Sequence, residues 1–183
     1  MMKALLIIDM QTGSFKPYSI RYNTTHTIER INLLSEKFRS LGYPVIYIKH
    51  DGTKEDCFFP DTKDFEILPE LVQEPSDIVV VKEANDAFYN TELQSILVRE
   101  NVDELYICGC ATDFCVDATV KSALVKDFKI YIASDAHTTA SRPHIDAPTI
   151  IQYYNWLWSD LTPTKHKISV CSTTNIVDSL QTP

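Results

Sequence analysis

Short apolar runs alternate with amphipathic stretches along this chain. Runs that are apolar or β-branched at nearly every position are typical of strands buried on both faces. Between them, apolar residues recur at the spacing of a helix, most clearly over residues 28–41, just ahead of Gly42. The predicted strands are residues 4–8, 45–48, 78–81, 105–108, 130–133 and 168–171. Further helices are predicted over 91–97, 116–124 and 150–158.

This alternation predicts an α/β fold, with a mostly parallel sheet of about six strands and helices on both faces. The length of 183 residues fits one domain, so we expect a single domain over residues 1–183. In such sheets, ligands bind in the crevice beyond the carboxyl ends of the strands. The residues that follow each strand are therefore the first candidates for a functional site.

Composition narrows the classes of partner. Lys and Arg number 17 against 25 Asp and Glu, a net charge of −8, which disfavours nucleic acid and anionic membrane surfaces. No stretch approaches the roughly 20 apolar residues of a membrane helix. The apolar run 4–8 ends at Asp9 with no cleavage site, so we read no signal peptide and expect the reducing cytosol. The five cysteines are accordingly expected to be thiols.

Three chemically active residue types stand at or near strand ends. Asp9 follows the first predicted strand, Lys82 the third, and Cys115 closes the loop 109–115 after the fourth. A cysteine in the first turn of a helix, capped by Thr112 or Asp113, would have its thiolate stabilised by the helix dipole and by Lys82. Asp9 could then act as a base. The residues alone leave two alternatives open: a buried, inert thiol and a structural Asp9–Lys82 ion pair.

The motifs resemble a known family. Residues 9–11 (Asp-Met-Gln), Lys82 with 87–88 (Ala-Phe), and 109–119 (Gly-Cys-Ala-Thr-Asp-Phe-Cys-Val-x-x-Thr) resemble those of the isochorismatase-like cysteine hydrolases. That group includes nicotinamidases and ureidoacrylate amidohydrolases. The resemblance extends from about residue 3 to about residue 160.

The resemblance implies a Rossmann-like, three-layer domain and a catalytic triad of Asp9, Lys82 and Cys115. It implies a cis peptide bond between Cys110 and Ala111, and an oxyanion hole formed by the backbone N–H groups of Ala111 and Cys115. Family members commonly form dimers or tetramers, so a homodimer or homotetramer is expected.

The implied activity is hydrolysis of a C–N, amide-like bond of a small molecule through a thioester. Isochorismatases that cleave a vinyl ether lack a cysteine at the position of Cys115. Nicotinamidases carry an Asp-x-His metal motif after the second strand, which residues 49–52 do not match, so we expect no metal and regard nicotinamide as a doubtful substrate. No Gly-x-Gly-x-x-Gly follows the first strand, and no cofactor is expected. A nicotinamidase or ureidoacrylate-type activity remains an alternative, as does a noncatalytic thiol redox sensor.

Pocket walls are expected to be mostly apolar. Core packing is about equally consistent with each aromatic candidate. The substrate-binding candidates are Phe15, Phe59, Phe88, Tyr89 and Cys110, and Phe58, next to Phe59 in the loop after the second strand, is a further aromatic candidate. Asp86 is a further candidate if it faces the pocket.

Five residues of the C-terminal half are distinctive without an assigned role. His137 or His144 could pair with Cys115 in a papain-like arrangement, although His137 more naturally shapes the pocket rim. Arg142 has no assigned mechanism. Trp156 and Trp158 stand two positions apart on a predicted helix and cannot both face one core, so one of them could serve a subunit interface.

Overall fold

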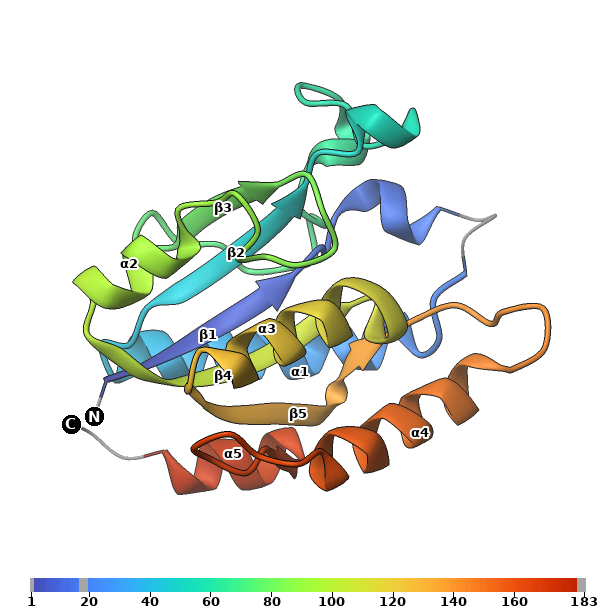
Figure 1. Ribbon diagram of the computed structural model, residues 1–183. Coiled ribbons are helices and arrows are strands. Elements are labelled where there is room, and N and C mark those ends of the chain that lie inside the picture. The colour runs from blue at the N-terminus through green and yellow to red at the C-terminus, as the bar shows by residue number, and fades with distance from the viewer. Residues whose placement is uncertain (1, 17–19, 181–183) are drawn as a thin grey trace.

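Six strands form one parallel sheet in the computed structural model, which describes residues 2–16 and 20–180 (Figure 1). Their order across the sheet is β3-β2-β1-β4-β5-β6, and every neighbouring pair is parallel. The strands are β1 (Met2–Ile8), β2 (Val45–His50), β3 (Ile78–Lys82), β4 (Val102–Cys110), β5 (Lys129–Thr138) and β6 (Ser169–Cys171). The predicted fold class is therefore confirmed, and each predicted run overlaps a strand.

Side chains of β1 alternate between two hydrophobic cores, which is why the whole strand is apolar. Leu6 and Ile8 face one core, where helices α2, α3 and α4 pack, whereas Leu5 and Ile7 face the other, where α1 and α5 pack. Figure 1 shows α3 in front of the sheet and α1 behind it. This is the three-layer arrangement that the resemblance implied.

The helices follow the predicted apolar stripes. They are α1 (Thr24–Ser40), α2 (Leu93–Arg99), α3 (Asp117–Val125), α4 (Ala147–Asp160) and α5 (Thr173–Ser179). The sequence pattern did not predict α5, which is short and begins at the side-chain cap of Ser172. On α4, Trp158 is buried and Trp156 is exposed, so a role for Trp156 in oligomer contacts stays a prediction. Among the described helices, none combines the length and the apolar character needed to cross a membrane.

The order of the strands reverses between β1 and β4, the central pair. In doubly wound sheets this switch point opens a crevice beyond the carboxyl ends of the strands. The two strands approach closely at Gly109, where φ is +116° and a Cβ atom would lie 2.2 Å from the carbonyl oxygen of Ile8. Only glycine fits there. Asp9 and the loop after β4 consequently emerge side by side.

Candidate active site

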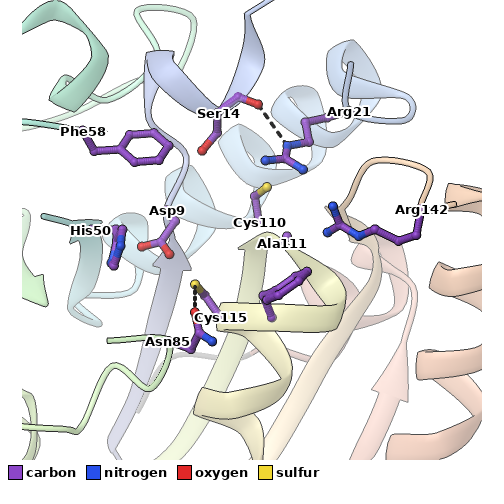
Figure 2. A pocket seen from close by; sticks show the side chains of 11 residues that line it. Asp9, Ser14, Arg21, His50, Phe58, Asn85, Cys110, Ala111, Cys115 and Arg142 are labelled. Atoms are coloured by element: carbon purple, nitrogen blue, oxygen red, sulfur yellow. Dashed lines mark hydrogen bonds between the residues drawn. The ribbon is translucent and has the colours of Figure 1, made fainter. Parts of the chain in front are cut away.

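A pocket of about 200 Å³ lies at this switch point. Its floor is formed by the ends of β1 and β4, and Figure 2 shows the side chains of Asp9 and Cys115 reaching into it. The loops after β1 and β5 contribute Arg21 and Arg142 to its walls. It is smaller than the roughly 300–1,000 Å³ typical of ligand pockets, so it fits a compact small molecule.

Lys82 is buried beneath the pocket, where it contacts the lining residues Asp9 and Cys115. Its Nζ lies 2.7 Å from Oδ2 of Asp9 and 3.4 Å from Sγ of Cys115. It also donates to the carbonyl oxygen of Ala84 at 2.9 Å, and its side chain is 0% exposed. Three residues from three strand ends thus meet around one ammonium group. We call Asp9, Lys82 and Cys115 the Cys115 cluster.

The protonation of this cluster follows from burial and charge. Burial lowers the pKa of Lys82, but Asp9 and Cys115 more than offset this effect, so the net shift is upward and the ammonium stays charged. Burial raises the pKa of the Cys115 thiol; Asp9 raises it further, and Lys82 opposes both. The resting sulfur therefore keeps its proton. The expectation of a lowered thiol pKa was wrong for the resting site, because burial outweighs Lys82.

Asp9 is the group in position to accept a proton. One carboxylate oxygen, Oδ2, accepts from Lys82, whereas Oδ1 is buried and has no hydrogen-bond partner in the described part of the chain. Asp9 also has a φ of 47°, in the left-handed region that non-glycine residues rarely adopt. A buried carboxylate oxygen without a donor is costly and is often found at functional sites.

The loop after β4 differs from the predicted helix start. Residues Thr112–Val116 form one π-helical turn, and α3 begins only at Asp117. Neither predicted cap residue caps the helix: the Thr112 hydroxyl bonds His137, and the Asp113 carboxylate accepts from Arg142. The peptide bond before this turn, Cys110–Ala111, is cis. Cys115 thus lies in the turn that precedes α3, facing the pocket.

His137 lies behind this turn rather than in the pocket. Its Nδ1 is 2.9 Å from the Thr112 hydroxyl and its Nε2 is 2.9 Å from Oδ1 of Asn155 on α4, so both ring nitrogens are occupied. Burial lowers the pKa of His137 to about 4, which keeps the ring neutral. We call Thr112, His137 and Asn155 the His137 cluster. Neither ring nitrogen is available to Cys115, and His144 is exposed, so the papain-like alternative is not supported.

Phe58 lines the pocket, whereas the other four aromatic candidates lie outside the lining, which corrects their interpretation as pocket walls. Phe15 packs against the core beneath α1, and Phe88 stacks on Phe128 in the opposite core. Phe59 and Tyr89 are exposed. The sequence does not distinguish an aromatic residue of a pocket wall from one of the core, and Phe15 and Phe88 pack in the core. Among the five substrate-binding candidates, only Cys110 lines the pocket.

Several lining residues carried no clear sequence signal. Asn85 lies beside Cys115, with the thiol 3.5 Å from its Oδ1 (Figure 2). Its neighbour Asp86, the sequence candidate, instead accepts from the backbone N–H of Phe88. His50, at the end of β2, also lines the pocket, and the remaining lining residues without an assigned site role in the sequence are Ser14, Arg21, Phe114 and Arg142. Their positions depend on loop conformations that no periodic pattern encodes.

No group of three or more His, Cys, Asp or Glu side chains in residues 2–16 and 20–180 is arranged to hold a metal ion. The five cysteines are free thiols. Cys108 is fully buried in β4, with its Sγ 3.5 Å from the Leu6 carbonyl oxygen, as expected for a core residue.

Comparison with known proteins identifies relatives of this chain and solved structures that share its fold. The chain is 32% identical over 144 residues to the uncharacterized isochorismatase family protein YddQ of Bacillus subtilis (strain 168), covering 77% of this chain and 80% of that protein. It is 29% identical over 153 residues to nicotinamidase 3 of Arabidopsis thaliana, covering 74% and 73%. A crystal structure of an isochorismatase from Pseudomonas putida KT2440 aligns with a TM-score of 0.86 at 25% identity, covering 94% and 89%. Residues 3–148 match the isochorismatase domain, and the chain therefore belongs to the isochorismatase family of hydrolases.

Proposed function

We propose that this hydrolase cleaves an amide-like C–N bond of a small molecule, with Cys115 as nucleophile, Asp9 as acid and base, and Lys82 as the charge that organises both. The observation that supports this most directly is the position of the buried Lys82 ammonium, which contacts two residues that line the pocket, through the Asp9 carboxylate and the Cys115 sulfur. A purely structural ion pair would not require a thiol that borders a cavity.

The first half-reaction forms a thioester. Asp9 removes the proton from the Cys115 thiol, and the sulfur attacks the carbonyl carbon of the substrate. The carbonyl electron pair moves onto oxygen, where the backbone N–H groups of Ala111 and Cys115 would stabilise the oxyanion. When the oxyanion collapses, the C–N bond breaks, and Asp9 returns the proton to the departing nitrogen.

The second half-reaction regenerates the thiol. Asp9 takes a proton from water, and the resulting hydroxide attacks the thioester carbonyl. The C–S bond breaks, the acid product leaves, and the sulfur recovers its proton. Lys82 compensates charge in both steps, because each one places negative charge on Asp9 or on sulfur within reach of its ammonium.

Two alternatives make different predictions. A nicotinamidase or ureidoacrylate-type enzyme would release ammonia from nicotinamide or from a ureido compound. Because the chain is similar to nicotinamidase 3, nicotinamide is included among the substrates tested below. A noncatalytic redox sensor would react with alkylating agents at Cys115 and hydrolyse no amide.

The test is a panel of small amides, ureas and lactams, assayed for ammonia or amine release with the wild type and with Cys115→Ala. We expect turnover by the wild type and a loss of about 10³-fold or more in the variant, with the variant still folded. Intact-protein mass spectrometry should detect the acyl adduct on Cys115 with slow substrates. Cys171→Ala, which removes a half-buried thiol on β6 away from the pocket, is the matched control and should keep full activity. Unchanged turnover in Cys115→Ala would reject the proposal.

A further inference from the structure

Two arginines line one side of the pocket, opposite the residues proposed to react. Figure 2 shows the guanidinium groups of Arg21 and Arg142 extending toward the region above Cys110, while Asp9 and Cys115 lie at the other side. Arg21 comes from the segment before α1 and Arg142 from the segment after β5. Such a pair of cations in a small pocket could either be neutralised within the protein or bind a negatively charged ligand.

Arg142 is neutralised within the protein. Its Nε donates to Oδ2 of Asp113 at 2.8 Å, and its Nη2 donates to Oδ1 of Asp113 and to the Thr139 hydroxyl, each at 3.0 Å. Its guanidinium also lies 4.7 Å from the centre of the Phe114 ring. This bidentate pairing fixes the position of the side chain and compensates its charge.

Arg21 has no such compensation. In the described part of the chain its guanidinium makes one hydrogen bond, from Nε to the carbonyl oxygen of Ser14 at 2.9 Å, and no ion pair. That bond orients the group and leaves the two terminal nitrogens for a ligand. A guanidinium with a free pair of donors matches the two oxygens of a carboxylate.

We propose that Arg21 forms a carboxylate-binding subsite, so that the substrate is a small amide-like molecule that also carries a carboxylate group. This inference rests on the proposed function for the position of the scissile bond beside Cys115. Arg142, held in place by Asp113, forms the adjoining wall. The pocket volume of about 200 Å³ restricts the substrate to a short acid.

The charge balance of the pocket supports this assignment. Among residues 2–16 and 20–180, the charge of Asp9 is paired with Lys82 and that of Arg142 with Asp113, whereas the guanidinium of Arg21 has no ion-pair partner. The chain as a whole has a net charge of −8, so the positive charge of the pocket is opposite in sign to the net charge of the protein. Burial raises the pKa of the neighbouring Cys110 thiol to about 11, and both arginines oppose this rise, as expected if both act on the pocket interior.

Iodoacetate and iodoacetamide provide a test that requires no known substrate. Both alkylate a thiol by displacement of iodide, and they differ only in a carboxylate against a neutral amide. The rates of labelling at Cys115 are measured by peptide mass spectrometry in the wild type, in Arg21→Gln and in Arg30→Gln. Arg30→Gln removes an arginine on α1 that faces Asp135 outside the pocket, and is the matched control. Cys171 provides the reference within each protein.

We expect the iodoacetate-to-iodoacetamide rate ratio at Cys115 to fall about tenfold in Arg21→Gln and to stay unchanged in Arg30→Gln. An equal ratio in wild type and Arg21→Gln would overturn the subsite. In the wild type alone, acetate should slow labelling of Cys115 by iodoacetamide and acetamide should not; equal effects of the two would also overturn it. If the amide panel shows no hydrolysis but the ratio behaves as expected, the proposed function fails and the anion subsite stands.

Discussion

The Cys115 cluster and the His137 cluster lie on either side of the same turn, yet they differ in how completely their polar atoms are bonded. In the His137 cluster, both ring nitrogens have partners at 2.9 Å, and Asn155 additionally donates to the Ser134 carbonyl oxygen at 3.0 Å. In the Cys115 cluster, Oδ1 of Asp9 has no partner among the described residues, and the thiol borders the pocket.

This difference separates a structural network from a reactive one. A buried histidine with both nitrogens bonded cannot exchange protons without breaking those bonds, so it holds the turn in place. A buried carboxylate oxygen with no donor, next to a thiol, has a vacant position for a proton. We therefore expect substitutions in the Cys115 cluster to lower activity, with a loss of stability as well where a buried charge is left unpaired, and substitutions in the His137 cluster to lower stability while sparing the reacting groups.

The largest effect is expected for Asp9→Asn, which removes the proposed base and should lower kcat by about 10³-fold. The fold is also affected, because Asn leaves the Lys82 ammonium buried without its counter-charge, a loss of about 3 kcal/mol. The amide found in the panel provides the activity assay, and urea unfolding at pH 7 measures stability.

The control for this prediction is the double variant Asp9→Asn/Lys82→Met. It removes both charges, so it should be as inactive as Asp9→Asn but more stable, because no unpaired charge remains. A double variant no more stable than Asp9→Asn would contradict the account of Lys82 as a charge held by Asp9. Activity above a tenth of wild type in Asp9→Asn would contradict the role of Asp9.

The next largest effect concerns pH and the His137 cluster. The pKa of His137 is about 4 in the folded protein against an ordinary 6.5, because of burial. Between these values the unfolded chain binds a proton that the folded protein does not, so stability falls as the pH falls through this window and is unaffected above it. The pKa shift of His137 contributes about 3 kcal/mol to the free energy of unfolding above this window, and about 2 kcal/mol of this contribution should be lost between pH 7 and pH 5.

Urea unfolding at pH 7 and pH 5 measures this loss, and His137→Gln should lose about 2 kcal/mol less than the wild type over the same interval. His26→Gln is the matched control: His26 is exposed on α1, and its replacement should leave the wild-type dependence in place. NMR titration of the His137 ring in the wild type gives the same information without a variant. A ring that takes up its proton near pH 6.5 would refute the prediction.

The fold was predictable from the sequence because burial on both faces leaves a direct mark on it. The run 4–8 is apolar at every position since alternate side chains enter opposite cores, and the stripe 28–41 marks the buried face of α1. The short helix α5 was not predictable in this way, because its seven residues include few apolar positions and its start depends on the Ser172 cap.

The site was predictable only where a chemically reactive residue lies at the end of a predicted strand. Asp9 and Lys82 follow or end apolar strands, so topology alone suggested that they meet. Arg21 and Asn85 lie in loops, where position depends on turn geometry and on contacts such as the Ser14 carbonyl. Phe88 was predicted to line the pocket because it follows a strand, but its side chain packs in the core. A position near a strand end is therefore not sufficient to place a residue in the site.

The smallest effect tests whether the His137 cluster is structural. Thr112→Val removes the hydroxyl that lies 2.9 Å from Nδ1 of His137 while keeping the shape of the side chain. It leaves a buried ring nitrogen without a partner and should cost about 1.5 kcal/mol of unfolding free energy at pH 7. Asn85→Ala is the matched change beside the Cys115 cluster; because Asn85 is exposed, it should cost less than about 0.5 kcal/mol. Removing one partner from the His137 cluster leaves a buried polar atom without a hydrogen bond, whereas removing the exposed Asn85 side chain does not. Equal losses of unfolding free energy for the two variants would therefore contradict the structural role of the His137 cluster.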